Sequence, residues 1–306
     1  AFIDVLDRSS DISSLSEKTS LLDGVAVIKS QIADLEEIVN SLSVKVILIG
    51  LDQKDYDSEM AASLRRLRFE GTEVLNALNA SEIYGGRTPL ELLDDDTVMS
   101  ASLSSSMPAV SSYKRAVDIA ASVIGIIILS PLALLIAVAV KISDPRGKVF
   151  YTQKRVGQFG EVFTIIKFRT MREDAETGTG PIWAQDHDNR ITGMGRMLRK
   201  FRMDEIPQFI NVLRGDMSVV GPRPERPEIV KELTEKIPFY EERINMVPGL
   251  TGWAQVRHPY GGTLEDAKKK LEYDLYYMKY LSMSLDLQII LRTLRIALFG
   301  LERSAE

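Results

Sequence analysis

The chain contains no cysteine, and its only histidines are His187 and His258. The absence of cysteine excludes disulfides, zinc sites with cysteine ligands and thiol nucleophiles. Two histidines are too few for a histidine-rich metal site, and their scarcity argues against a serine triad. Whatever chemistry this protein performs must therefore rely on carboxylates and on lysine or arginine.

A glycine-rich phosphate loop is also missing from residues 1–95, although strand and helix patterns alternate there. The order of these patterns is typical of α/β structure, in which βαβ units build a parallel sheet. Strands are expected at 24–28, 44–50 and 72–76, and amphipathic helices at 32–42 and 57–69. Residues 1–4 have the pattern of a strand end, which would place the usual ligand-binding turn before Ala1. A regulatory or structural domain is therefore favoured over a working nucleotide site.

The net charge of -5 conceals an acidic first part and a basic remainder. Residues 1–106 contain 9 Lys and Arg against 19 Asp and Glu, whereas the remainder contains 29 against 24. The stretch 96–112, acidic and then serine-rich, predicts a linker between the two parts. The basic part has no recognition-helix or zinc-finger pattern, so its cations suit anionic lipid or phosphorylated substrates rather than nucleic acid.

An uncharged run at residues 119–140 is long enough to cross a bilayer, since a straight helix of this length spans about 33 Å. Ser130 and Pro131 lie at its centre, and a proline inside a helix costs roughly 3 kcal/mol and bends it. Cations flank both ends, namely Lys114, Arg115, Lys141, Arg146 and Lys148. Taken alone, the length favours a kinked spanning helix. The flanking cations also suit a re-entrant hairpin of two half-helices, with freed backbone groups satisfied by Ser130 or neighbouring protein.

A carboxylate pair, Asp204 and Glu205, lies directly behind a cluster of cations. The pattern before the pair predicts a strand at 162–168, a loop at 178–184 and a helix at 190–201, with cations at Arg196, Arg199, Lys200 and Arg202. Such a pair can hold an anion against a nucleophile, and we expect the cations to lower the pKa of Asp204 and keep it ionised. Helix capping is the alternative interpretation, and on spacing alone it is favoured.

Seven motifs occur in the order found in one bacterial family. They comprise residues 151–157, 167–171, 204–208, 211–218, 220–224, 247–253 and 273–277. The chain closely resembles the monotopic phosphoglycosyl transferases, specifically the large polyprenyl-phosphate hexose-1-phosphate transferases of exopolysaccharide and O-antigen assembly. The resemblance covers about 113–300. It implies a partial Rossmann-like, CoA-binding-like domain at 1–95, a re-entrant membrane helix at 113–148 and a mainly helical α+β catalytic domain at 149–306. Large members usually begin with transmembrane helices, so Ala1 is not expected to be the natural start.

The resemblance also implies a reaction. Asp204 would attack a UDP-sugar, release UMP and form an aspartyl phosphosugar, which undecaprenyl phosphate would then attack. Glu205 would orient Asp204 or handle a proton of the acceptor. Mg²⁺, with Asp204 as a ligand, would neutralise the leaving UMP. The other implied site residues are the phosphate clamp Lys167, Arg169, Arg199 and Arg223, with Asp274 near the site.

The same resemblance implies a monotopic protein at the cytoplasmic face of the bacterial inner membrane, with the hairpin broken at Ser130–Pro131. Its partners would be UDP-sugar, undecaprenyl phosphate and membrane lipid, without nucleic acid, and a homodimer through the N-terminal domain stays open. Glucose and galactose are the sugars that the resemblance implies, with glucose slightly preferred. The sequence does not specify which is used, because discrimination would depend on the geometry of loops such as 178–188.

Several residues have plainer interpretations. Lys167 and Arg169 alternate on a strand and could simply face water. The four tyrosines within 273–280 recur at helical spacing, which favours core or interfacial positions over stacking on uracil. The triplet Asp-His-Asp at 186–188 resembles a metal site, but a turn is favoured in a polar loop. Residues 285–299 could lie in the membrane interface or in the core, and the resemblance favours the interface.

Two other classes of function stay open. The first is a membrane-docked regulatory or scaffold protein with a decayed transferase domain, against which the intact Asp204, Glu205, Lys167 and Arg223 argue. The second is a nucleotide-dependent oxidoreductase built on the N-terminal half, against which the missing glycine-rich loop argues.

Overall fold

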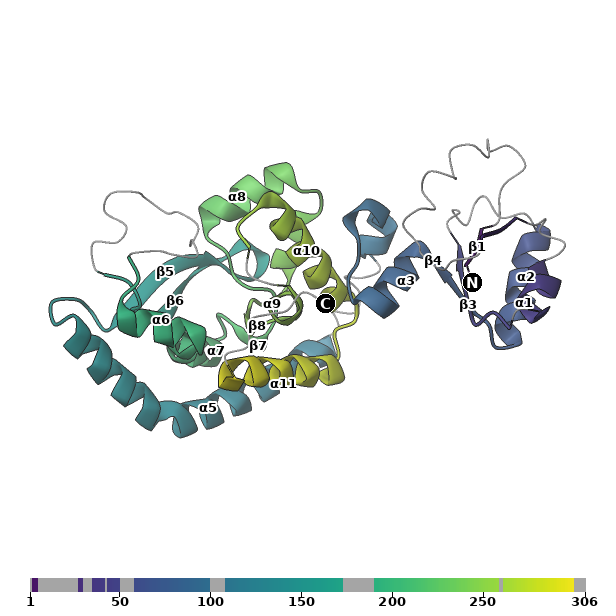
Figure 1. Cartoon of the computed structure of the whole chain (residues 1–306). Coiled ribbons are helices and arrows are strands. Elements are labelled where there is room, and N and C mark those ends of the chain that lie inside the picture. Colours follow the sequence, from purple (N-terminus) through teal and green to yellow (C-terminus); the bar gives the residue numbers. More distant parts are fainter. Residues whose placement is uncertain are drawn as a thin grey trace. The chain divides into compact units, whose positions relative to one another are not determined.

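The computed structural model describes residues 2–4, 27–29, 35–41, 43–49, 58–99, 108–172, 190–258 and 261–299. The chain divides into two units, Ala1–Leu92 and Leu93–Glu306, whose elements are labelled in Figure 1. Each unit contains its own cluster of buried apolar side chains.

The first unit contains two pairs of parallel strands. β1 (Phe2–Asp4) pairs with β2 (Val27–Lys29), and β3 (Val46–Ile49) pairs with β4 (Glu73–Asn76). The helical elements are α1 (Leu35–Ser41), α2 (Ser58–Phe69), α3 (Ala77–Ala80), the π-helical turn η5 (Ser81–Gly85) and the 3-10 turn η6 (Leu90–Leu92). α2 connects β3 to β4 and buries apolar residues at helical spacing, which confirms the predicted βαβ pattern. A Rossmann-like sheet stays a prediction, because the described strands form two separate pairs.

The second unit begins with one long apolar helix, α5 (Pro108–Ser143). Within the described ranges, it is the one helix long and apolar enough to cross a membrane. Pro131 lies inside α5, and Figure 1 shows the helix bending along its length. Pro131 has no N–H for the carbonyl of Ile127, and the Ser130 hydroxyl donates to that carbonyl instead, at 3.0 Å. The predicted role of Ser130 is confirmed, but the two expected half-helices form a single bent helix.

Both halves of α5 pack against other elements of the second unit. In the first half, Arg115 donates to main-chain carbonyls near the end of α7 (Phe209–Arg214), at 2.5 and 2.7 Å. Gly125 faces an aromatic ring of α7, and a Cβ there would come within 3.0 Å of that ring. In the second half, Ile136 and Val140 belong to the buried apolar cluster. The two halves of the helix therefore lie against the same unit.

An apolar stripe on the other side of α5 remains exposed. Its members are Ile119, Val123, Ile124, Ile127, Ile128, Leu134, Leu135, Val138 and Ile142. α11 (Met283–Phe299) has a second exposed stripe, comprising Met283, Leu287, Leu291, Leu294 and Leu298. Lys114 of α5 forms an ion pair with Asp286 of α11 at 2.7 Å, which joins the two helices. Exposed apolar surface on this scale is typical of an interaction site.

Two small sheets and several helices form the rest of the second unit. β5 (Phe150–Val156) pairs antiparallel with β6 (Val162–Phe168), which confirms the strand predicted at 162–168. The helix predicted at 190–201 is α6 (Gly193–Lys200), and it begins later because the Thr192 side chain caps it. The remaining elements are η7 (Gln158–Gly160), η8 (Met203–Gln208), β7 (Ser218–Val220), α8 (Pro227–Lys236), η9 (Tyr240–Asn245), β8 (Gly249–Thr251), α9 (Trp253–Arg257) and α10 (Leu264–Lys279).

Glycines allow β7 and β8 to approach closely. The two strands are parallel, and the chain continues past them with hydrogen bonds from Gly221 N–H to the Thr251 carbonyl at 2.9 Å and from Gly249 N–H to the Pro222 carbonyl at 2.8 Å. A Cβ at Gly221, or at Gly252 beyond β8, would overlap backbone atoms of the facing segment. The motifs 220–224 and 247–253 are thereby held together at one closely packed strand pair, and Arg223 follows directly after it.

Candidate active site

The 3-10 helix η8 carries the carboxylate pair Asp204 and Glu205. The chain turns into η8 at Arg202, which has a left-handed backbone conformation with φ 54° and ψ 22°. Such a conformation is uncommon for a residue with a side chain, and it is often found at functional sites. Each carboxylate residue retains only 8% of its surface exposure.

Glu205 is the anchor of two cations. Its Oε1 atom accepts from Lys167 Nζ at 3.0 Å and from Arg223 Nη2 at 2.7 Å. Lys167 comes from β6, and Arg223 lies shortly after β7, which pairs with β8. Burial acts to raise the pKa of Glu205, but Arg223, Lys167 and Arg202 outweigh it and hold this pKa below its ordinary value. Glu205 is therefore ionised and paired with both cations.

The pKa of Asp204 is shifted in the opposite direction. Burial, together with the neighbouring Glu205 charge, raises the pKa of Asp204 to about 6 against the pull of Lys167, Arg199 and Arg223. The cations do act to lower this pKa, as predicted, but burial and then the charge of Glu205 outweigh them, so that the net shift is upward. Across the described part of the chain, no hydrogen bond or ion pair reaches the Asp204 carboxylate. Asp204 is thus a mostly ionised, uncommitted carboxylate at neutral pH.

Three of the four predicted clamp residues lie around this pair. Lys167 and Arg223 bind Glu205, and the charge of Arg199 acts on Asp204 while its Nε donates to Thr170 Oγ1 at 2.9 Å. Their contact with a phosphate stays a prediction.

The fourth residue, Arg169, has a different environment. Its guanidinium pairs with the Asp144 carboxylate at 3.0 Å and donates to the Asp144 carbonyl at 3.1 Å, which holds the loop that follows α5. Only 9% of Arg169 is exposed, so this pair gives it a structural contact within the fold. A role for Arg169 in phosphate binding stays a prediction.

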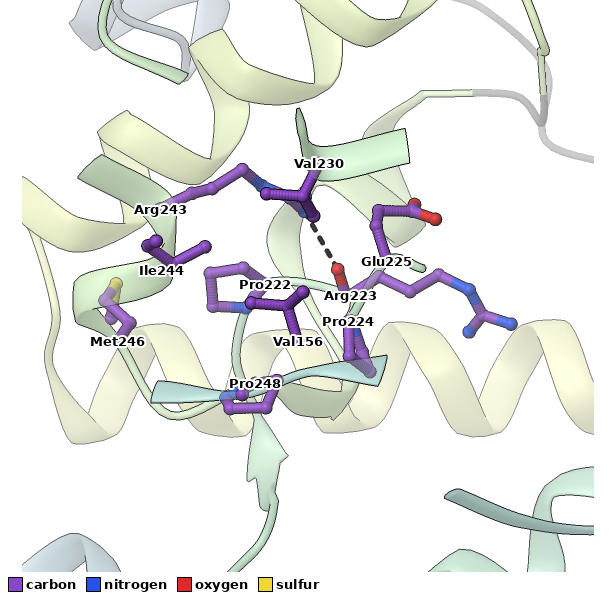
Figure 2. Close-up of a pocket in the computed structure, with 11 residues that line it drawn as sticks. Val156, Pro222, Arg223, Pro224, Glu225, Val230, Arg243, Ile244, Met246 and Pro248 are labelled. Atoms are coloured by element: carbon purple, nitrogen blue, oxygen red, sulfur yellow. Dashed lines mark hydrogen bonds between the residues drawn. The ribbon is translucent and has the colours of Figure 1, made fainter. Parts of the chain in front are cut away.

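Asp274 lies in α10 and contacts Arg243 instead of a site carboxylate. The Arg243 guanidinium donates to Asp274 Oδ2 at 3.0 Å and to the Arg223 carbonyl at 2.9 Å. Figure 2 shows this second bond and a largely apolar pocket next to it, lined by side chains that include Val156 and Pro248. In Figure 2 the Arg223 side chain extends away from these apolar side chains. Asp204 and Glu205 do not line this pocket.

A magnesium ion fits this site through one protein carboxylate. No cluster of three or more His, Asp or Glu suited to a metal occurs among the residues that the structure describes. Asp204 offers uncommitted oxygens, which are the ligands that Mg²⁺ prefers, whereas Glu205 is occupied by two cations. Mg²⁺ usually binds one or two carboxylates together with substrate phosphates, so Asp204 and a bound diphosphate would suffice.

Asn211 is a structural residue that the sequence-based predictions did not single out. Its side chain accepts from Ile166 N–H at 3.1 Å and donates to the Thr164 carbonyl at 2.8 Å, so that it replaces a neighbouring strand along β6. Asn211 is fully buried, and its contacts hold the strand that carries Lys167. Its place within the motif 211–218 was the available sequence signal.

The remaining predicted residues have varied positions. The tyrosines lie on or at the end of α10, with Tyr277 fully buried and Tyr276 stacked on Trp253 at 5.9 Å between ring centroids. The burial of Tyr277 confirms the core interpretation for this residue. The loop 178–188, which includes the Asp-His-Asp triplet, lies outside the described residues.

A buried carboxylate pair surrounded by lysine and arginine, next to a long apolar helix, is typical of a protein that binds anions and carries a membrane-type segment. Comparison with known sequences identifies it more closely. The chain belongs to the bacterial sugar transferase family, whose pattern matches residues 109–300. This finding supports the family resemblance deduced from the seven motifs.

Named relatives are similar to this chain over different lengths. The UDP-N-acetylgalactosamine-undecaprenyl-phosphate N-acetylgalactosaminephosphotransferase of Aeromonas hydrophila is 40% identical over 254 residues, which cover 83% of this chain and 59% of that protein. The UDP-glucose:undecaprenyl-phosphate glucose-1-phosphate transferase of Xanthomonas campestris pv. campestris is 44% identical over 174 residues, covering 56% and 36%. A protein of the same name from Caulobacter vibrioides is 43% identical over 189 residues, covering 60% and 69%. The chain thus spans less than two thirds of the length of the first two relatives.

Proposed function

We propose that this protein transfers a sugar 1-phosphate from a UDP-sugar to undecaprenyl phosphate as a membrane step of polysaccharide synthesis. Family membership and the printed functions of the relatives support the reaction class. The single observation that carries the mechanism is the contrast within the carboxylate pair. Glu205 is bound by two cations, whereas the Asp204 carboxylate has no such partner among the described residues and is available to react.

The proposed reaction has two steps. A carboxylate oxygen of Asp204 attacks the phosphorus that bears the sugar, which forms an aspartyl phosphosugar and breaks the bond to UMP. A phosphate oxygen of undecaprenyl phosphate then attacks the same phosphorus and displaces Asp204, which yields undecaprenyl diphosphosugar. Lys167, Arg199 and Arg223 would stabilise the negative charge that develops on the phosphoryl oxygens. The raised pKa of Asp204 makes its ionised form a stronger nucleophile than an ordinary aspartate.

Glu205 serves in this proposal as an orienting residue. Its low pKa makes it a poor proton acceptor, and its ion pairs hold Lys167 and Arg223 on one side of the reacting phosphate. Mg²⁺ held by Asp204 and the substrate diphosphate would supply neutralisation of the leaving UMP.

We further propose that the protein is monotopic, at the cytoplasmic face of the inner membrane. Because both halves of the bent α5 pack on one unit, a straight passage to the opposite leaflet would separate one half from its contacts. A re-entrant position keeps those contacts and buries the exposed apolar stripe in lipid. The exposed stripe of α11 would then lie at the interface, close to the acceptor phosphate. A homodimer stays a prediction.

The donor is proposed to be a UDP-hexose or its N-acetylated form. The alignment with the Aeromonas relative is longer than the second unit alone and therefore extends into the first, which favours UDP-N-acetylgalactosamine over the UDP-glucose preferred from sequence alone. The choice of donor should be tested by comparing UMP release from UDP-N-acetylgalactosamine, UDP-glucose and UDP-galactose.

The test uses the protein in lipid nanodiscs with Mg²⁺ and a donor labelled in the sugar. We expect release of UMP, a labelled adduct on Asp204 in the absence of acceptor, and transfer of the label to undecaprenyl phosphate when acceptor is added. Asp204→Asn should abolish the adduct, whereas the exposed control Glu228→Gln should not. Full turnover by Asp204→Asn would refute the covalent mechanism. Failure to release UMP from every donor would favour the scaffold alternative.

A further inference from the structure

A buried ion pair connects α10 to the segment that carries Arg223. Asp274 is 3% exposed and Arg243 is 8% exposed, and their closest charged atoms lie 2.9 Å apart. The two residues come from α10 and η9, and neither contacts the carboxylates of the candidate active site directly. A buried pair of this kind is costly to desolvate, so its retention calls for a specific role.

The contacts of Arg243 indicate that role. Besides Asp274, its guanidinium donates to the Arg223 carbonyl at 2.9 Å through Nη2 and to the Tyr240 hydroxyl at 3.0 Å through Nη1. Figure 2 shows Arg243 reaching the Arg223 carbonyl from the side opposite to the Arg223 guanidinium. Arg243 therefore holds the main chain of Arg223, and leaves its side chain directed elsewhere.

The side chain of Arg223 needs such support. It extends to Glu205 at 2.7 Å, and 31% of it remains exposed. Pro222 and Pro224 restrict the backbone on either side, and although they lack an N–H, their carbonyls accept from Gly249 N–H at 2.8 Å and from Arg155 Nη1 at 3.0 Å. The hydrogen bond from Arg243 supplies an anchor at the residue between the two prolines.

Asp274 makes this anchor electrostatically acceptable. Arg243 is buried, and a buried guanidinium without a carboxylate partner is costly. The Asp274 carboxylate neutralises Arg243, so that Arg243 can remain charged inside the fold while it binds the Arg223 carbonyl. The chain of contacts then runs from Asp274 through Arg243 and the Arg223 backbone to Glu205.

We infer that Asp274 and Arg243 are positioning residues, which act through Arg223 to hold its guanidinium over the reacting phosphate. This inference rests on the proposed function, and it assigns to Asp274 a role that does not require contact with substrate. It also explains why an acidic residue of the motif 273–277 lies deep in the fold, away from Asp204.

The experiment is a double-mutant cycle between Asp274→Asn and Arg223→Gln in the full chain. Misplacing a catalytic group slightly can cost about 100-fold in rate, so Asp274→Asn should lower kcat/KM for UMP release by about 10- to 100-fold. In the Arg223→Gln background the same change should cost less than about twofold, because its target is already absent. An undiminished loss in that background would overturn the inference.

A second measurement separates positioning from general stability and needs no activity. Hydrogen exchange followed by mass spectrometry should show faster exchange of the Gly221 and Gly249 amides in Asp274→Asn, with unchanged exchange in β6. Arg243→Lys keeps the charge opposite Asp274 but loses the fork that reaches the Arg223 carbonyl, and it should reproduce the effect if Asp274→Asn does not fold. Tyr240→Phe is the matched control, because it removes a contact of Arg243 that does not lead to Arg223.

These readouts distinguish failure of the inference from failure of the proposed function. If the unaltered protein released no UMP from any donor, the proposed function would fail, but exchange at residues 221 and 249 would still report on the anchor. If UMP were released and Asp274→Asn changed neither the exchange nor the rate, the positioning role would be wrong and the reaction would stand.

Discussion

The burial of Asp204 should make the unaltered protein less stable than a variant that lacks this charge. In the folded protein the pKa of Asp204 is raised from 3.8 to about 6, chiefly by burial and then by the charge of Glu205. A pKa difference of one corresponds to about 1.4 kcal/mol, so ionising Asp204 in the folded state costs about 3 kcal/mol more than in the unfolded chain. Asp204→Asn removes the charge at nearly constant shape, and it should recover up to about that free energy of unfolding.

The gain should depend on pH in a defined direction. Above pH 6 the folded protein carries the ionised Asp204, so the full penalty is present and Asp204→Asn has its largest advantage. As the pH falls from 6 towards 4, the folded state takes up a proton that the unfolded state does not yet bind, and the penalty disappears. The advantage of Asp204→Asn should therefore decline over this interval.

Thermal unfolding of the second unit in nanodiscs, followed at pH 8 and at pH 4.5, is the appropriate assay. For a unit of this size, about 1 kcal/mol shifts Tm by about 2 to 4 °C, so Asp204→Asn should raise Tm at pH 8 by up to about 6 to 12 °C. The exposed variant Glu228→Gln should leave Tm unchanged at both pH values. A lower Tm for Asp204→Asn at pH 8, or an advantage that does not change with pH, would refute the assignment of Asp204 as a buried, uncommitted carboxylate.

Three further predictions concern the site and its supports. The rate of adduct formation should fall about tenfold per pH unit below pH 6, because Asp204 becomes protonated. Lys167→Gln should move this decline to higher pH, because it removes a cation that lowers the pKa of Asp204. Rapid-quench measurements against pH would contradict this prediction if the profiles of the variant and the unaltered protein coincided. Gly221→Ala should destabilise the second unit by about 1 to 3 kcal/mol or more, because the added Cβ overlaps the backbone beside β8. An unchanged Tm would show that the packing of β7 against β8 can relax. Pro131→Ala, which restores an N–H for the carbonyl of Ile127, should straighten α5 and lower transfer to the lipid acceptor more than adduct formation; equal effects on both steps, measured with labelled donor, would contradict the role of the bend.

Local patterns were sufficient for much of the secondary structure. β6 was predicted at its observed residues because its apolar and polar residues follow strand periodicity and turn signals bound it. The parallel pairing of β3 with β4 followed from one amphipathic helix, α2, between two apolar runs. The role of Ser130 could also be predicted, because the donor that proline lacks and the carbonyl left free lie within one turn of helix. α6 began later than expected, since the cap at Thr192 decides the first turn.

The sequence by itself determined the candidate residues, because Asp204 and Glu205 fall within a family motif directly behind a cluster of cations, whereas their spacing alone favoured helix capping. Only the tertiary structure decided how those charges are divided. Lys167 and Arg223, separated by 56 positions along the chain, both bind Glu205, whereas burial raises the pKa of Asp204 and no such partner reaches it in the part of the chain described. Likewise, the fold directs Arg169 to Asp144 and Asp274 to Arg243. The physical reason is that pKa values and ion pairs depend on distance and solvation in space, which sequence spacing does not specify for residues from different elements.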